Sequence, residues 1–432
     1  MDSDLFMIDY IEQIASFLAE GSEVVFYTVG SGTFINIREL KNRFGLLPKA
    51  VCDKDKKKQG RTYKGLEGLT VISPEEALLM FPNGKFFIPS LDYRYQIIGY
   101  LTEECGVSSD RIINYIPVEK IRSCSFLQKA LIYDQSGDMR FCWRNPCPSI
   151  KSENNSLNSI ELLKLRNKLI DEIKNGKTPS HRACMNCPQI CEGFYPKEPL
   201  SWSVNYFCQS ICNYKCSYCT LSHGNGIKPE KDAGRHTLGE VINSYKNERL
   251  LNNDYSVILS TAGEPLLHPK KKEFYEAFDG AELVINTNGS IYDEELVKLM
   301  NYNKVLLVVS LDAGTNKTYK TIKGVGSLEN VKRNLTEYSK TSIGIVSLKY
   351  LFVPGVNDNI EDIEGFVKFV EDVNAMFCII ALDYFSMDNV TEQTKNMIKY
   401  MSSRLSEKNI LCVPYTAWET TEYNAEIRKL TE

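Results

Sequence analysis

Hydrophobic and polar residues alternate along the chain with two periodicities, one typical of strands and one typical of helices, and the two kinds of segment follow each other in turn. Near the start, apolar residues at helical spacing precede an apolar strand over 23–28. Residues 73–76 form a capping box with proline at the first helical position, and an apolar strand follows over 85–89. Because this order of elements favours a parallel sheet, we expect residues 1–118 to form a small α/β domain.

The same alternation returns over a longer stretch after residue 200. Apolar segments with strand character occur at 202–207, 256–261, 282–287, 304–311, 343–353 and 376–384. Amphipathic helical patterns separate them, for example at 238–250 and 327–339. Six such units in series predict an α/β fold with a partial (β/α)6 TIM-like barrel and C-terminal helices over residues 200–432.

Composition and charge narrow the class of protein. The 432 residues are 43% hydrophobic, and 51 Lys and Arg against 55 Asp and Glu give a net charge of −4, so no basic excess favours nucleic acid as a partner. No apolar run in the sequence, 305–311 included, approaches the ~20 residues that span a bilayer. The chain starts with acidic residues where a secretory signal would be positive, so we expect a cytoplasmic protein without a membrane span.

Cysteine is distributed very unevenly. Nine of the 14 cysteines fall between Cys142 and Cys219. In a reducing compartment such clustering indicates metal or iron–sulfur ligation rather than disulfides. Five cysteines are isolated and are interpreted as small buried hydrophobic residues: Cys52, Cys105, Cys124, Cys378 and Cys412.

The second cysteine group has the spacing C-x3-C-x2-C and directly follows a predicted strand. It consists of Cys212, Cys216 and Cys219. Thiolates are the natural ligands of iron–sulfur clusters, and three of them leave one iron of a [4Fe–4S] cubane open to a chelating ligand. By the logic that separates catalytic from structural metal sites, an open position indicates catalysis.

This part of the chain resembles the radical S-adenosylmethionine (radical SAM) superfamily. An aromatic residue, Tyr218, precedes the last cysteine of the group, as in that family. Further motifs follow at the ends of successive predicted strands, namely the G-G-E-P-like segment 261–265 with Ala262 in place of the first glycine, Asn-Thr-Asn-Gly at 286–289, the segment 309–313, and Lys349 before 353–358. The resemblance covers about residues 200–390.

The resemblance implies roles for particular residues. The open iron would bind the amino and carboxylate groups of S-adenosylmethionine, with Glu264 near the amino group and Lys349 near the carboxylate. Ser310 would contact the ribose, and Tyr218 would lie near the adenine. Gly263 and Asn288 belong to the same cofactor-binding motifs. One electron from the cluster would release methionine and a 5′-deoxyadenosyl radical, which abstracts hydrogen from the substrate.

Cys208 leaves other interpretations of this loop open. If it is a fourth ligand, the loop forms a structural zinc site or a closed electron-transfer cluster, and the chain is a non-catalytic electron carrier or sensor. Otherwise Cys208 is a buried spectator, or a thiol that donates hydrogen to a substrate radical.

The first cysteine group provides four thiolates. Cys142 is followed 42 residues later by C-x2-C-x3-C, formed by Cys184, Cys187 and Cys191. The segment 119–199 resembles the SPASM or twitch domain of many radical SAM enzymes, although that domain normally follows the barrel. The resemblance implies an auxiliary [4Fe–4S] cluster, with structural zinc as the alternative. Cys147 is either a substitute ligand or a spectator.

The amino-terminal domain carries weaker signals. Segment 30–35 begins like a dinucleotide-binding loop but has isoleucine in place of the third glycine, and Asp53 lies where a ribose-binding acid would be. Segments 53–60 and 71–76 resemble the Rossmann-like domain that precedes the catalytic part of some nucleotide-sugar acyltransferases. A docking domain with an empty crevice is the alternative. The lysines at 56–58 form either a solvated loop or a phosphate contact.

The leading domain suggests a substrate class. We expect a small metabolite such as a sugar or a nucleotide-linked sugar. Because auxiliary-cluster domains are frequent in peptide maturases, modification of a ribosomally made peptide is the alternative. A one-electron donor such as flavodoxin or ferredoxin is the expected protein partner.

Overall fold

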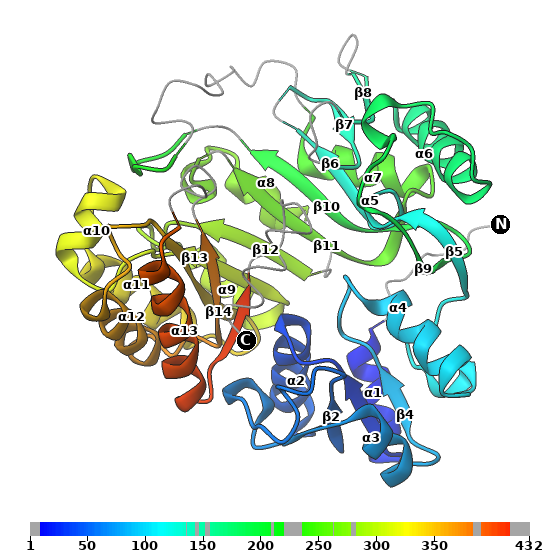
Figure 1. Cartoon of the computed structure of the whole chain (residues 1–432), viewed down its shortest axis with the longest axis horizontal. Coiled ribbons are helices and arrows are strands. Elements are labelled where there is room, and N and C mark those ends of the chain that lie inside the picture. Colours follow the sequence, from blue (N-terminus) through cyan, green and yellow to red (C-terminus); the bar gives the residue numbers. More distant parts are fainter. Residues whose placement is uncertain are drawn as a thin grey trace.

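The computed structural model describes residues 9–134, 136–142, 147–151, 156–208, 211–219, 236–261, 263–277, 282–382 and 390–414. Its strands form one four-stranded, one ten-stranded and one two-stranded sheet (Figure 1). Within the described ranges, no helix combines the length and the apolar character that crossing a lipid bilayer requires.

The four-stranded sheet lies in the first 118 residues, and we call this part the N-terminal unit. Its strands are all parallel and lie in the order β3-β2-β1-β4. Its elements are α1 (Tyr10–Ala19), β1 (Val24–Tyr27), α2 (Ser31–Phe44), β2 (Ala50–Cys52), β3 (Val71–Ile72), α3 (Pro74–Met80), β4 (Lys85–Phe87) and α4 (Arg94–Gly99). The predicted capping box is confirmed, because the Ser73 hydroxyl accepts from the Glu76 amide while the Glu76 carboxylate accepts from the Ser73 amide.

The ten-stranded sheet holds the longer alternation. Its order is β16-β15-β14-β13-β12-β11-β10-β6-β7-β8, parallel throughout except for β7 and β8. The strands are β6 (Ala130–Tyr133), β7 (Met139–Arg140), β8 (Ser149–Ile150), β10 (Ser201–Cys208), β11 (Leu251–Thr261), β12 (Glu282–Thr287), β13 (Val305–Ser310), β14 (Ile345–Phe352), β15 (Phe377–Leu382) and β16 (Leu411–Pro414). The six predicted strands are β10 to β15, in sequence order, and β6 and β16 extend the parallel sheet at either side.

The α/β class with parallel sheets is therefore confirmed, whereas closure as a six-unit barrel stays a prediction. The sheet also crosses the predicted limit at residue 199, because β6 pairs with β10. The predicted domain limits remain predictions.

Helices cover one face of this sheet. They are α7 (Leu238–Asn247), α8 (Lys271–Glu276), α9 (Glu294–Tyr302), α10 (Asn316–Lys323), α11 (Leu328–Ser339), α12 (Ile360–Asp372) and α13 (Glu392–Glu407). The antiparallel pair β5 (Val118–Cys124) and β9 (Ile190–Pro196) forms the two-stranded sheet, and the short α5 (Ser125–Lys129) follows β5 in the chain. The longer α6 (Ser159–Lys174) lies beside β7 and β8 (Figure 1).

Opposite faces of β13 pack against different parts of the molecule. Leu307 and Val309 belong to the core that the helices share, whereas Leu306 and Val308 pack in a second core with Phe34 of α2. Because strand side chains alternate, the second core lies on the other face, which we call the inner face. The N-terminal unit is thus fixed against the inner face by a common hydrophobic core (Figure 1).

Candidate functional site

The loop that carries Cys212, Cys216 and Cys219 is held on both sides by backbone hydrogen bonds. The Ile211 carbonyl accepts from the Glu264 amide at 2.7 Å, and the Ser217 amide donates to the carbonyl of Ile322 at 2.7 Å. A Cβ on Gly263 would lie 2.4 Å from the Ile211 oxygen, so only glycine permits this approach. The turn after β11 and the end of α10 therefore fix the loop.

The three thiols of this loop lie near enough to one another to interact. Cys212 is exposed, Cys216 and Cys219 are half-buried, and each interacts electrostatically with another of the three. Such a soft donor set suits an iron–sulfur cluster. Among the described residues, no three His, Cys, Asp or Glu side chains are grouped closely enough to hold a single metal ion. The side chain of Cys208 lies outside the described residues.

Glu264 is buried at the turn that supports the loop. Its carboxylate accepts from the hydroxyl of Thr287 at 2.6 Å and from the amides of Asn288 at 2.7 Å and Leu266 at 3.2 Å. Burial raises the pKa of Glu264, and these donors oppose that rise. Three of the four acceptor positions of the carboxylate are therefore occupied within the protein, and its contact with a bound amino group stays a prediction.

Asn288 connects the same turn to the cysteine loop. Its side-chain amide donates to the Asn213 side-chain oxygen at 2.9 Å, and Asn213 in turn donates to the hydroxyl of Ser290 at 2.9 Å. Asn213 stands directly after Cys212, so the end of β12 positions the first cysteine of the loop.

Tyr218 belongs to a buried polar network. Its hydroxyl donates to the carboxylate of Asp312 and accepts from the Lys323 ammonium at 2.9 Å. Lys323 and Asp312 form an ion pair with side chains 1% and 0% exposed. Burial opposes the charge of Lys323, but Asp312 outweighs it and the pKa of Lys323 is raised. Tyr218 is thus fixed by its hydroxyl, and its predicted contact with adenine stays a prediction.

Ser310 and Lys349 lie side by side. They are register partners on β13 and β14, and both side chains are half-buried. Ser310 ends its strand, so both lie near the carboxyl edge of the sheet that carries the cysteine loop. Gly263, Glu264 and Asn288 lie at the ends of the neighbouring strands. The last two residues of the predicted strand 376–384 lie outside the described residues.

Lys323 could not be identified as a site residue from the sequence. It ends α10, eleven residues after Asp312, and no motif marks it. Asp312 itself adopts φ +60°, a left-handed conformation that Asp tolerates better than most residues. A charged residue followed by the left-handed cap Gly324 is the only sequence signal near Lys323, and it indicates a helix end rather than a partner for Tyr218.

Three cysteines of the first group line a small cavity. Its walls include Cys142, Cys184, Cys187 and also Cys124, but not Cys191. In the pairing of β5 with β9, Cys124 is opposite Ile190, and Cys191 is opposite Ser123. Neighbouring residues of a strand point to opposite faces, so Cys124 and Cys191 face away from each other.

The surroundings of Cys191, Cys147 and Cys124 agree with which of them line the cavity. Cys191 is exposed, and its sulfur lies 3.4 Å from the Tyr195 hydroxyl. The sulfur of Cys147 lies 3.7 Å from a guanidinium nitrogen of Arg140. Cys124, interpreted from sequence as an isolated hydrophobic residue, is buried as expected, but it lies close enough to Cys142 and Cys187 to interact with them electrostatically.

Comparison with known proteins gives one family and several partial relatives. Residues 206–370 match the radical SAM superfamily. A GTPase Obg of Brachyspira hyodysenteriae is 28% identical over 182 residues, 40% of this chain and 26% of that protein. A GTP 3′,8-cyclase of Alkaliphilus oremlandii is 28% identical over 183 residues, 41% of this chain and 55% of that protein.

Among solved structures, Streptococcus suis SuiB bound to S-adenosylmethionine superposes with a TM-score of 0.41 at 14% identity, covering 60% of this chain and 57% of that one. The chain spans between about a quarter and two thirds of the length of the first curated relatives that it matches. The matched range contains this three-thiol loop (Cys212, Cys216 and Cys219) and the polar residues Glu264, Asn288, Ser310 and Lys349. Residues 206–370 of this chain therefore form a radical SAM domain, the domain of an enzyme superfamily.

Proposed function

We propose that this chain cleaves S-adenosylmethionine reductively and removes a hydrogen atom from a small polar metabolite, a sugar or a nucleotide-linked sugar. One observation carries the proposal. Backbone hydrogen bonds hold the three-thiol loop at the carboxyl edge of the sheet, where Ser310 and Lys349 lie side by side within the radical SAM domain. An electron carrier with a closed cluster, the alternative, would not need these polar residues beside the loop.

Each residue of this site would have its own role in binding the cluster or the cofactor. Cys212, Cys216 and Cys219 would hold a [4Fe–4S] cluster, which supplies the electron that converts S-adenosylmethionine to methionine and a 5′-deoxyadenosyl radical. Ser310 offers a hydroxyl to ribose, and Lys349 offers an ammonium to a carboxylate.

The first cysteine group supports a second cluster with a changed ligand set. We infer that Cys124, Cys142, Cys184 and Cys187 hold it, because these four line one cavity. The exposed Cys191, on the other face of β9, is then free of the cluster. Four thiolates close a cubane, so this cluster would stabilise the fold between β5 and the ten-stranded sheet or relay electrons.

Anaerobic reconstitution tests the first proposal. We expect about eight irons per chain, the sum of two four-iron clusters, and release of 5′-deoxyadenosine when a low-potential reductant and S-adenosylmethionine are added. Cys216→Ala is expected to abolish 5′-deoxyadenosine and to retain the irons of the second cluster. Full iron content without any 5′-deoxyadenosine would favour the electron carrier.

Two matched serine variants test the second ligand set. Cys124→Ser is expected to lose the irons of the second cluster, whereas Cys191→Ser retains them and keeps the full absorption of the iron–sulfur charge-transfer bands. Loss of iron from Cys191→Ser, with Cys124→Ser unaffected, would restore the ligand set predicted from the spacing alone.

Nothing in the described residues favours a peptide over a small metabolite, and a leader-peptide domain would not be expected to form a four-stranded parallel sheet. The metabolite is therefore the first candidate and the peptide the second. Turnover assays with both substrate classes separate them.

A further inference from the structure

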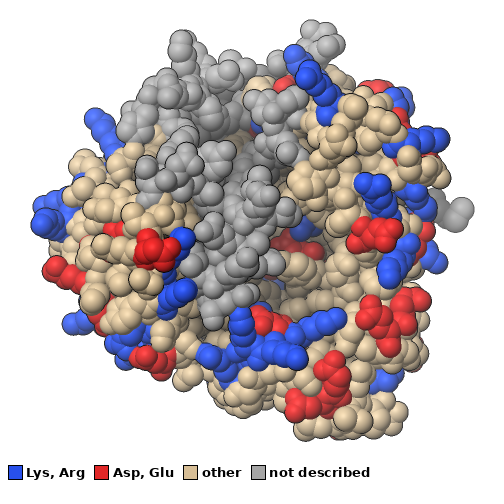
Figure 2. All heavy atoms as spheres, in the orientation of Figure 1, with Lys and Arg blue, Asp and Glu red and all other residues tan. Residues whose placement is uncertain are grey.

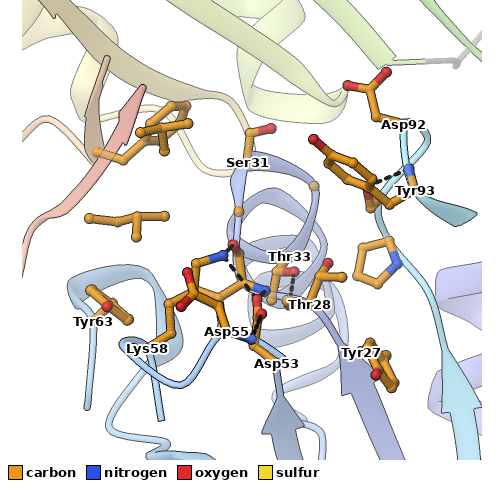
Figure 3. A pocket seen from close by; sticks show the side chains of 18 of the residues that line it. Tyr27, Thr28, Ser31, Thr33, Asp53, Asp55, Lys58, Tyr63, Asp92 and Tyr93 are labelled. Carbon is orange, nitrogen blue, oxygen red and sulfur yellow. Dashed lines mark hydrogen bonds and ion pairs between the residues drawn. The ribbon is translucent and has the colours of Figure 1, made fainter. Parts of the chain in front are cut away.

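A large cavity lies between the N-terminal unit and the inner face of the ten-stranded sheet. Its volume is about 1660 Å³, above the ~300–1,000 Å³ of ordinary small-molecule pockets. In Figure 3, Asp53, Lys58 and Tyr63 border it on one side and Asp92 and Tyr93 on the other, beneath strands of the large sheet. Because the two parts share a hydrophobic core, the cavity is a built feature of the fold.

The cavity runs along the inner face toward the radical SAM site. Ile258, Val284 and Leu306, on adjacent strands, line its inner end. Ser310 is four residues beyond Leu306 on β13, a rise of about 13 Å at ~3.3 Å per residue. A ligand that contacts both the N-terminal unit and the reaction site must therefore be elongated.

Cations line the mouth of this cavity. Lys54 and Lys57 come from the loop after β2, and Lys399 comes from α13 on the opposite side. Among the described residues, neither Lys54 nor Lys399 forms a salt bridge, although Lys54 acts electrostatically on Glu75. The Lys54 ammonium lies 4.2 Å from the centre of the Tyr100 ring. Figure 2 shows blue side chains along the lower lip of a hollow and red side chains within it. The ammonium groups of Lys54 and Lys399 at the entrance suit a phosphate group.

Glu282 lies deeper in the same cavity. It is the first residue of β12 and is half-buried, and its carboxylate has no hydrogen-bond or ion-pair partner within the described part of the chain. Burial raises its pKa to about 7; nearby Asp92 and Asp254 add to this rise, and Lys304 and Arg94 oppose it. A carboxyl group in such a position is open to a donor from a ligand, such as a sugar hydroxyl.

We propose that this cavity binds the substrate, a sugar linked to a nucleoside diphosphate, with the diphosphate at Lys54 and Lys399 and a sugar hydroxyl donating to Glu282. This assignment rests on the proposed function, which takes a nucleotide-linked sugar as the substrate.

Calorimetric titration of the reconstituted full chain, without reductant, tests the assignment. The probes are UDP-glucose, UDP-N-acetylglucosamine and GDP-mannose, with UDP and GDP as truncated partners. We expect at least one sugar nucleotide to bind with a Kd below 1 mM. The double variant Lys54→Gln/Lys399→Gln is expected to weaken the sugar nucleotide and its parent diphosphate alike, by about tenfold or more.

Glu282→Gln gives the sharper result. It is expected to weaken the sugar nucleotide about fivefold to tenfold and to leave the parent diphosphate unchanged, a difference that a merely structural role would not produce. Lys56→Gln, in the same loop but outside the cavity, is the matched control and should bind like the wild type. The assignment is overturned if no sugar nucleotide binds, if Lys56→Gln weakens binding as much as the double variant, or if Glu282→Gln weakens both ligands equally.

These experiments can refute the radical chemistry and the cavity assignment independently of each other. Binding of sugar nucleotides by a chain that releases no 5′-deoxyadenosine would refute the radical chemistry and keep the cavity assignment. Release of 5′-deoxyadenosine by a chain that binds none of the probes would do the reverse.

Discussion

The buried ion pair between Lys323 and Asp312 gives the most demanding stability prediction. Lys323→Met keeps the length of the side chain and removes its charge. Asp312 then remains 0% exposed, with the Tyr218 hydroxyl and the Leu351 amide as its remaining donors. Removing one partner of a buried pair costs about 3–5 kcal/mol, because the other charge is left uncompensated.

This loss is large enough to measure by thermal unfolding. One kcal/mol shifts Tm by about 2–4 °C in a domain of roughly 150–250 residues, so the shift should be on the order of 10 °C. Circular dichroism follows the transition. Lys320→Met, on the exposed side of the same helix, is the matched control, and its effect is expected to stay within about 0.5 kcal/mol.

A double variant separates the effect of the buried charge on stability from the effect of packing. Lys323→Met/Asp312→Asn leaves no buried charge, and Asn tolerates the left-handed backbone at this position. It should therefore recover part of the stability that the single variant loses. The reasoning is refuted if Lys323→Met melts within 2 °C of the Lys320→Met control (about the shift expected for 1 kcal/mol), or if the double variant is less stable than the single one.

Two further predictions concern the sites themselves. Because the pKa of Glu282 is raised from 4.5 to about 7 in the folded chain, the wild type loses stability as pH rises between these values. Glu282→Gln should thus have the same melting temperature as the wild type at pH 4.5 and a higher one at pH 8, where its free energy of unfolding should exceed that of the wild type by up to about 3 kcal/mol. Equal melting temperatures at pH 8 would contradict this prediction. Gly263→Ala would place a methyl group 2.4 Å from the Ile211 oxygen, so it should lower the iron content of the three-thiol site; Gly239→Ala, whose Cβ meets only Ala277 at 3.6 Å, should not.

The long apolar strands were predictable from the sequence, and the short ones were not. β10 to β15 are six to eleven residues long, whereas β6 and β16 have four each. A four-residue apolar run does not distinguish a strand from a buried turn of helix, so only the pairing with β10 or β15 identifies these two.

Spacing along the chain also concealed contacts between distant residues. Cys124 lies 18 residues before Cys142 and was interpreted as isolated, but the pairing of β5 with β9 brings it beside Cys187. Lys323 reaches Tyr218 only because α10 ends against the cysteine loop. The three thiols of the second group were predictable, because their ligand spacing is local.

The central claim is that the cluster at Cys212, Cys216 and Cys219 has one iron open to S-adenosylmethionine. Electron paramagnetic resonance of the reduced chain tests it directly. We predict that adding S-adenosylmethionine changes the spectrum of one of two clusters, and that Cys216→Ala abolishes this change while the other cluster's signal persists. A reduced spectrum that S-adenosylmethionine leaves unaltered, in a chain with its full iron content, would contradict the claim.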